Sequence, residues 1–402
     1  MARPTLRASR LQDLALLLLM ALPAALPDSA FAQSLAVRFF PDKALYAYPL
    51  ESTRDLQGVL LQNVVVANTG SIPLTLTSVE LRVKNADGVT DMRRLVAADL
   101  RRSAASGARL QAAGMIDALD FQFGGSTALG PSPRLAGDIT LGAGESLLIG
   151  HQFMSFRGSR QAVEVQATAS ANEGATVTGL GSVPILAGSR NRYRFPLSGR
   201  WTVVAGPTPF SHHRWVATQE FALDIARFGD GNSSHRGDGT KLTDYHAYGA
   251  EVLAAAPGVV SAVQDSVVET NDDLRRPGEE QLAYLRRVGE AQMKLMARGI
   301  NAIPGNFVLI EHAGGESSIY AHLQPGSVRV KVGDTVSAGQ PLGKLGSSGN
   351  STEPHLHFHV CDKPAVMHCA GVPVVFDDIE LPYADAPRPV QTGDVVVTTA
   401  PR

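Results

Sequence analysis

Alternating apolar and polar positions run through the first half of the chain and predict short β-strands. Residues 74–77 and 79–83 alternate, residues 59–67 are strand-like, and further strands are suggested at residues 138–141, 146–150 and 162–167. Glycine-rich turns separate them, which is typical of an all-β domain. We therefore expect residues 33–195 to form a β-sandwich of the immunoglobulin-like kind. Residues 103–133 are rich in glycine, alanine and serine, and we expect them to form a long loop.

The second half of the chain shows the same period of two. Its pattern predicts strands at residues 221–225, 306–312, 317–323 and 328–332, and a β-hairpin at residues 248–263. A helical pattern interrupts it between residues 265 and 305. There we expect a helix over residues 277–298, which begins near Pro277 and stops before Gly299. The sequence thus indicates an antiparallel sheet with a helical insertion, for which we favour ordinary packing over a lid.

Residues 354–360, which read PHLHFHV, alternate most strictly. As a strand, this stretch puts His355, His357 and His359 on one face and its apolar residues on the other. Two imidazoles on one face can reach a single metal ion or water, and imidazole is a common zinc ligand. The alternative is a histidine-rich edge strand that faces solvent. We leave His359 out of the catalytic set and expect it to be exposed.

Length and charge limit the class of protein. The chain has 402 residues and a formal net charge of −2. Because this length exceeds one ordinary hydrophobic core, we expect two domains. The sequence has no basic excess and no basic run, so we expect no nucleic-acid partner.

The N-terminus has the pattern of a secretory signal peptide. Basic residues precede an apolar stretch at residues 14–26, and the small residues Ala30 and Ala32 suggest cleavage before Gln33. The apolar stretch is short for a membrane span, although an uncleaved anchor is the alternative. We therefore interpret residues 1–32 as a signal peptide and expect a periplasmic or secreted protein with no stable membrane insertion after cleavage.

Cys361 and Cys369 are the two cysteines of the chain. In an exported protein such a pair favours a disulfide that closes a short loop. A cysteine zinc site is the less favoured alternative, because the spacing does not match a zinc knuckle. The bridge would pin the segment that leaves the histidine strand.

Residues 210–376 resemble the lysostaphin/β-lytic class of zinc endopeptidases, which cleave peptide cross-links or bridges in peptidoglycan. Four blocks in the family's order carry the resemblance: residues 221–224 (FALD), 248–260 (YGAEVLAAAPGVV), 320–323 (YAHL) and 349–358 (GNSTEPHLHF). The resemblance implies a mainly β fold like the duplicated hybrid motif. We expect this peptidase domain to span residues 196–385, with residues 386–402 as a C-terminal tail.

The resemblance also implies roles for individual residues. Asp224 and His357 would be zinc ligands, whereas His322 and His355 would orient the attacking water and stabilise the oxyanion. Zinc with three protein ligands keeps a position open for water and lowers the pKa of that water.

One ligand position departs from the family. The family's first ligand is a histidine four residues before the aspartate, where this chain has Glu220. Glu220 could bind zinc itself, His212 or His213 could supply the missing imidazole, or the site could be degenerate. We favour His213, with His212 and Glu220 as alternatives.

Three functions are compatible with these residues. The first is an exported zinc metalloendopeptidase that acts on peptidoglycan stem peptides or bridges. The second is an inactive relative that binds peptidoglycan or activates a partner cell-wall hydrolase, which the departure at Glu220 favours. The third is a zinc protease that acts on a protein chosen by the β-sandwich.

Overall fold

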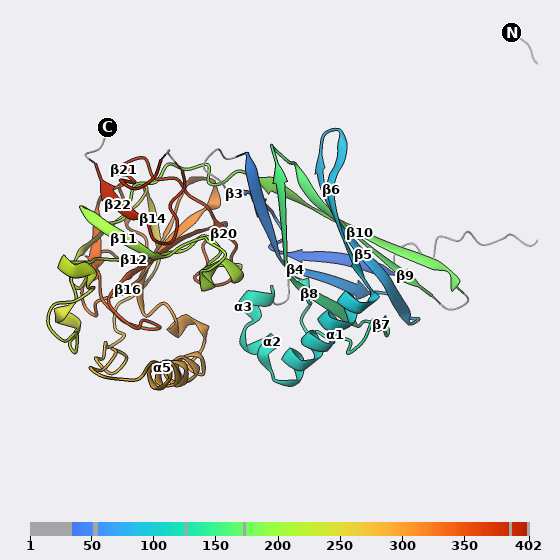
Figure 1. Ribbon diagram of the computed structural model, residues 1–402, viewed down its shortest axis with the longest axis horizontal. Coiled ribbons are helices and arrows are strands. Elements are labelled where there is room, and N and C mark those ends of the chain that lie inside the picture. The colour runs from blue at the N-terminus through green and yellow to red at the C-terminus, as the bar shows by residue number, and fades with distance from the viewer. Residues whose placement is uncertain (1–33, 51–54, 125–127, 172–173, 386–387, 400–402) are drawn as a thin grey trace, which may run out of the picture.

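The computed structural model describes residues 34–50, 55–124, 128–171, 174–385 and 388–399. The signal peptide predicted for residues 1–32 lies outside them. Two β-rich parts lie side by side, with helices α1 to α3 below the first part and helix α5 below the second (Figure 1). Among the described residues, no helix has both the length and the apolar character that a membrane crossing requires.

The first part contains two sheets. One sheet is built from strands β1 (Leu35–Phe40), β3 (Tyr48–Pro49), β4 (Leu56–Asn68) and β8 (Ser146–Arg157). The other is built from strands β2 (Leu45–Tyr46), β5 (Leu74–Asn85), β6 (Gly88–Val96), β7 (Thr140–Leu141), β9 (Ala162–Ser170) and β10 (Thr176–Leu186). The predicted strands thus form, although most of them are longer than the alternation indicated.

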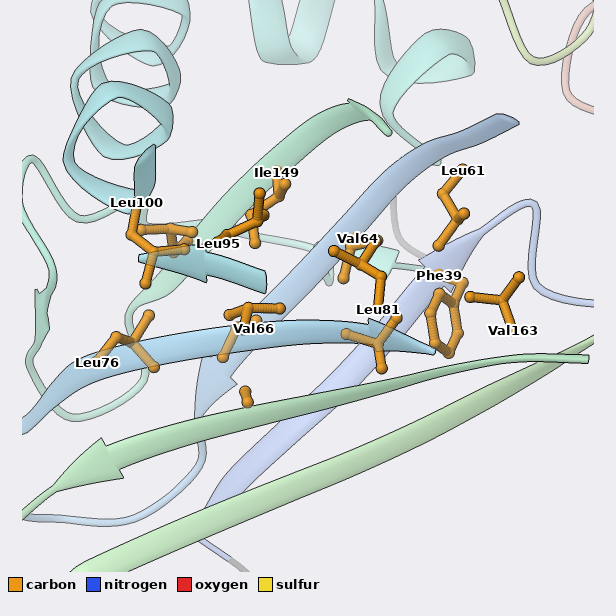
Figure 2. Close-up of a cluster of buried hydrophobic side chains, with 14 of the residues drawn as sticks. Phe39, Leu61, Val64, Val66, Leu76, Leu81, Leu95, Leu100, Ile149 and Val163 are labelled. Atoms are coloured by element: carbon orange, nitrogen blue, oxygen red, sulfur yellow. The ribbon is translucent and has the colours of Figure 1, made fainter. Parts of the chain in front are cut away.

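Apolar side chains from both sheets meet in one core. Val64 and Val66 of β4 pack with Leu76 and Leu81 of β5, and with Val163 of β9 (Figure 2). Two sheets that share such a core make a β-sandwich. The immunoglobulin-like character of this sandwich stays a prediction.

Helices occupy much of the segment that we expected to be a long loop. These are α1 (Ala97–Ala112), α2 (Met115–Ala118) and α3 (Asp120–Phe123). In α1 the buried residues Leu100, Ala104 and Gly107 recur at helical spacing, and Asp99 accepts a hydrogen bond from the backbone of Val96 at the helix start. The loop prediction was wrong because alanine is also the best helix former.

The second part is a ten-stranded antiparallel sheet. Its strands are β11 (Arg200–Ala205), β12 (Leu223–Ala226), β14 (Gly258–Gln264), β15 (Asn306–Glu311), β16 (Ser317–Leu323), β17 (Thr335–Val336), β19 (Leu356–Cys361), β20 (Gly371–Val372), β21 (Ile379–Glu380) and β22 (Val395–Thr398). Strands β13 (Glu251–Leu253) and β18 (Pro341–Lys344) pair separately. Short 3-10 turns connect these strands, namely η3 (His212–Trp215), η4 (Asp230–Asn232), η5 (Leu242–Asp244), η6 (Ile300–Ala302) and η7 (Ala313–Gly315).

Three expectations for this part can be compared with the sheet. The hairpin prediction was wrong, because β13 pairs with β18 whereas β14 pairs with β15 and β17. The predicted helix is α5 (Gln281–Met296), which has no buried residue. The segment expected to be a C-terminal tail supplies β22, which pairs with β11 and β21. The domain boundaries themselves stay predictions.

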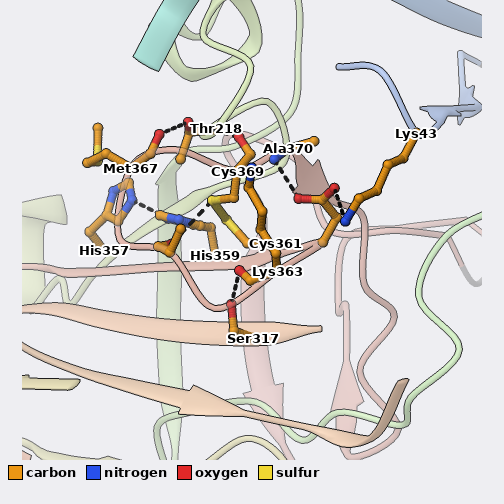
Figure 3. The surroundings of a disulfide bond; sticks show 12 residues. Lys43, Thr218, Ser317, His357, His359, Cys361, Lys363, Met367, Cys369 and Ala370 are labelled. Carbon is orange, nitrogen blue, oxygen red and sulfur yellow. Dashed lines mark hydrogen bonds and ion pairs between the residues drawn. A yellow bond between two sulfur atoms is a disulfide. The ribbon is translucent and has the colours of Figure 1, made fainter. Parts of the chain in front are cut away.

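Cys361 and Cys369 form the expected disulfide. The bridge lies at the end of β19, and the loop that it closes also carries Met367, whose carbonyl accepts a hydrogen bond from the Thr218 hydroxyl (Figure 3). The segment that leaves the histidine strand is therefore tied to the segment that precedes β12.

Candidate active site

Asp224 and His357 meet across two neighbouring strands. Strand β19 lies between β16 and β12 within the sheet, and its register sets His357 opposite Asp224 of β12. Nδ1 of His357 lies 2.9 Å from Oδ1 of Asp224. Strand pairing alone thus brings together two predicted zinc ligands that are far apart in the sequence.

His213 reaches the same carboxylate from turn η3. Its Nε2 lies 3.4 Å from Oδ2 of Asp224, and its ring stands nearly perpendicular to that of His357 at 5.0 Å. His213 is buried, and its Nδ1 has no hydrogen-bond partner within the described residues. His212 lines the same cavity but is exposed, with its ring 4.1 Å from that of His213. Of these two neighbours, His213 is the one buried against Asp224.

His322 and His355 lie together beside this group, with their ring centroids 4.8 Å apart. Nδ1 of His355 is 2.8 Å from the carbonyl oxygen of Glu353, and its Nε2 is 3.5 Å from Oδ1 of Asp224. Nδ1 of His322 is 2.7 Å from the carbonyl oxygen of Ser348. Because a carbonyl can only accept, both imidazoles carry their proton on Nδ1 when neutral and keep a lone pair on Nε2.

The backbone at His322 is strained. Its φ is +64°, in the left-handed region that residues other than glycine seldom adopt. Its N–H donates to the carbonyl of Pro304, and its own carbonyl accepts from Gly346. Such strain persists only where the surroundings fix it, and it is concentrated at functional sites.

Glu220 does not line this cavity. It is buried, and its carboxylate lies 3.0 Å from the Arg214 guanidinium and accepts a hydrogen bond of 3.0 Å from Gln62. A buried arginine needs a counter-charge, and Glu220 supplies it. The structure therefore does not bring Glu220 to the ligand group around Asp224.

His359 is not exposed, contrary to our expectation. It is buried, and its Nδ1 lies 2.9 Å from Nε2 of His357 (Figure 3). If Nδ1 of His357 binds a metal ion, its Nε2–H can donate to Nδ1 of His359. A metal-binding histidine commonly donates its other N–H to a second side chain in this way. The sequence contained a signal for this contact, because the alternation puts His359 on the same face of the strand as His357.

The charge state of the group suits a bound cation. Burial lowers the pKa of His213 to about 3 and holds the pKa values of His322 and His359 well below the usual range. Burial alone would raise the pKa of Asp224, but the facing imidazoles hold it well below its usual range. His355 is the exception, because Asp224 outweighs burial and raises its pKa. Among the imidazoles in contact with the Asp224 carboxylate, burial thus disfavours the charged form of His213, whose lone pair can then bind a cation.

This donor set fits zinc. Zinc prefers imidazole nitrogen and carboxylate oxygen in groups of three protein ligands at catalytic sites. Asp224 has imidazole nitrogens on both of its oxygens, and the unpaired Nδ1 of His213 lies beside them. His212, His213 and Asp224 also offer ligand atoms that all lie within 4.8 Å of one another, and His357 contacts the same carboxylate.

Comparison with known proteins identifies part of this domain. Residues 290–368 match Peptidase family M23. The similarity to this family is limited to that segment. The matched segment carries His322, His355, His357 and His359, whereas His213 and Asp224 lie upstream of it.

Curated relatives match over short stretches. The cell division protein DipM of Caulobacter vibrioides is 43% identical over 68 residues, which is 16% of this chain and 11% of DipM. The peptidoglycan DD-endopeptidase ShyC of Vibrio cholerae is 43% identical over 58 residues, 14% of this chain and 13% of ShyC. Lysostaphin of Staphylococcus simulans is 54% identical over 50 residues, 12% of this chain and 10% of lysostaphin. The matched stretches thus cover only about a tenth of the length of these relatives.

Proposed function

We propose that this protein is a zinc metalloendopeptidase that hydrolyses peptide bonds in peptidoglycan cross-links or bridges. The observation that carries the proposal is the contact of the Asp224 carboxylate with His357 at 2.9 Å and with His213 at 3.4 Å. Two further imidazoles lie beside this group in the same cavity.

In this proposal Asp224, His357 and His213 hold the ion. Bound zinc would supply Lewis acidity, which lowers the pKa of a coordinated water and polarises the scissile carbonyl. His359 would keep His357 in the tautomer that leaves Nδ1 free to bind, because it accepts the other N–H.

His322 and His355 would handle protons. Each is fixed through Nδ1 by a backbone carbonyl, so each offers Nε2 for proton transfer. An imidazole held in this way can accept a proton from the attacking water and return it to the leaving amine. The protonated ring can also donate a hydrogen bond to the oxyanion as it forms.

The choice of substrate rests on the relatives. ShyC is a peptidoglycan DD-endopeptidase by name, and it is 43% identical to this chain over 58 residues. The basic n-region and apolar stretch of residues 1–32 support export to a periplasm or beyond, where peptidoglycan lies.

Purified sacculi provide the test. The protein is incubated with sacculi in the presence of zinc, and released fragments are identified by mass spectrometry. We expect new peptide termini with the wild type, and none with His357→Ala or His355→Ala. His246→Gln is the matched control, because His246 belongs to the same domain but does not line the cavity.

The other outcomes identify the alternatives. Zinc-dependent cleavage of proteins without cleavage of sacculi would contradict the peptidoglycan substrate. A folded protein that cleaves neither, but binds sacculi or raises the rate of a cell-wall hydrolase, would favour the inactive binding or activating relative.

A further inference from the structure

Turn η3, which carries His213, is held by side chains of the β-sandwich. The Gln62 amide on β4 donates to the carbonyl of Arg214 at 2.9 Å. Nε2 of His151 on β8 lies 3.0 Å from the carbonyl of Trp215, and the two rings are in edge contact. Two successive carbonyls next to His213 are thus fixed from the other domain.

The Arg214 side chain secures the same turn. It is buried, lies 3.0 Å from Glu220, and stacks over the ring of Tyr48 at 5.3 Å. The Gln62 amide also donates to Glu220 at 3.0 Å, so one side chain of the sandwich contacts both the turn and the counter-ion of its arginine.

The residues after the turn continue this contact. Ala217 belongs to a buried cluster with Phe40, Val65 and Leu148 of the sandwich. On the opposite side, the carbonyl of Ala217 accepts from Gly371 in the second domain. The segment is therefore clamped between the two domains.

The buried ring of His213 packs against the rings of His212 and His357 but has few polar contacts of its own. Nδ1 has no hydrogen-bond partner within the described residues, and Nε2 faces Asp224 at 3.4 Å. Its position therefore depends on the backbone of η3, which the sandwich holds.

We propose that Gln62 is a positioning residue of the metal site: through its hydrogen bond to turn η3 it holds His213 against Asp224. The β-sandwich is then a structural part of the metal centre and does more than cover or space it. This inference rests on the proposed function, in that it takes the group around Asp224 to bind zinc.

The test uses the full-length protein and measures zinc affinity by competition with a chromophoric chelator. Gln62→Leu keeps most of the side-chain volume and removes both hydrogen bonds. We expect it to weaken zinc binding at least about tenfold, as loss of a group that orients a ligand does. Gln166→Leu, the same change on β9 of the other sheet, is the control and should leave the affinity unchanged.

Two further readouts separate positioning from a general loss of stability. The visible spectrum of the Co²⁺-loaded Gln62→Leu protein should shift toward that of His213→Ala, because both lose the same ligand. In a His213→Ala background, Gln62→Leu should have no further effect on zinc affinity.

A second variant covers the case in which Gln62→Leu does not fold. His151→Asn removes the hydrogen bond to Trp215 on an exposed residue, and asparagine tolerates the positive φ of 49° found there. We expect His151→Asn to weaken zinc binding, as Gln62→Leu should.

The outcomes distinguish the two proposals. Suppose that folded Gln62→Leu keeps its zinc affinity and its cobalt spectrum while His213→Ala loses zinc. This result would overturn the positioning role of Gln62 and leave the proposed metal site intact. A folded wild type that binds no zinc would overturn both.

Discussion

His213 and Glu220 are close in the sequence but face opposite sides of the segment that carries them. His213 points toward Asp224, whereas Glu220 points toward Arg214 and Gln62. Each residue therefore has its own set of partners. We expect a change at His213 to affect zinc binding and a change at Glu220 to affect stability.

His213→Ala should lose zinc while the protein stays folded. Removal of a ligand should weaken binding by more than about 100-fold, which exceeds the usual cost of losing a group that only orients a ligand. Glu220→Gln should instead lower the free energy of unfolding by about 3 kcal/mol, because it leaves Arg214 buried without a counter-charge. Chelator competition and thermal unfolding of both variants check this. Abolished zinc binding in Glu220→Gln with full binding in His213→Ala would reverse the assignment.

His359 should influence zinc only through His357. His359→Phe keeps a ring of similar size but removes the acceptor for Nε2–H of His357, and we expect a loss of about 10- to 100-fold in zinc affinity. His359→Gln should retain most of the affinity, because its carbonyl oxygen can accept the same hydrogen bond. Equal affinities in all three proteins would argue against this role.

The sequence predicted some of these site residues better than others. Asp224 and His357 were named as ligands because they belong to the FALD and HLHF blocks that carry the family resemblance. The sequence favoured His213 over His212 without a local signal, since the difference between them depends on which ring the turn η3 buries. The role of Glu220 depends on Gln62 and Arg214, and no local pattern links residues that far apart in the sequence.

At the scale of elements, Glu316 anchors the segment that joins the two domains. Its carboxylate accepts hydrogen bonds from Ser189, Asn191 and Tyr193 side chains and from the backbone of Arg190. Burial alone would raise the pKa of Glu316, but these donors outweigh it and the pKa is lowered.

Glu316→Gln should therefore destabilise the protein in a pH-dependent way. At neutral pH we expect a loss of about 1–2 kcal/mol, reduced from the usual value for charged hydrogen bonds because the carboxylate is half-exposed. The contribution is fully present above the unfolded pKa of glutamate, about 4.3, and is lost as the pH falls through the lower folded value. Thermal unfolding from pH 7 to pH 3 should show the gap between the two proteins close in acid. A constant gap would rule out the carboxylate charge as its cause.

The disulfide loop is a second element whose contribution can be measured. Cys361 and Cys369 are separated by 8 positions, and a loop of this length stabilises by about 2.5 kcal/mol in the chain-entropy account. The double variant Cys361→Ser, Cys369→Ser should lose about this amount in denaturant unfolding. Its zinc affinity should also fall, since the loop contacts Thr218 in the segment that carries His213. Unchanged zinc affinity would confine the bridge to a role in stability.

Strands and helices with a local signal were predicted, whereas the pairing of strands far apart in the sequence was not. Strand-like composition identified β4 and β9, alternation identified β5, and helical spacing between Pro277 and Gly299 identified α5, which begins at Gln281. Helix α1 was missed because its composition is also typical of loops. The hairpin was wrongly predicted because β13 finds its partner in β18, far along the chain, and sequence proximity does not reveal such a partner.

At the scale of the whole molecule, the two domains meet at the segment that supplies a proposed zinc ligand. The sequence indicated two domains but gave the sandwich no defined role. That role depends on three side chains, Tyr48, Gln62 and His151, which contact turn η3 from distant positions in the sequence. Its detection therefore required the tertiary structure.

Zinc binding and the contact between the domains should be coupled in both directions. If Gln62 strengthens zinc binding by holding η3, then bound zinc must strengthen the hold of η3 on Gln62 by the same free energy. Zinc should therefore slow hydrogen exchange of backbone amides in β4 relative to a chelator-treated sample, and leave β9 unchanged. The effect should vanish in His213→Ala, because that variant can no longer transmit zinc binding to the turn. Protection of β4 that persists without His213 would show that the domains are coupled by a different route.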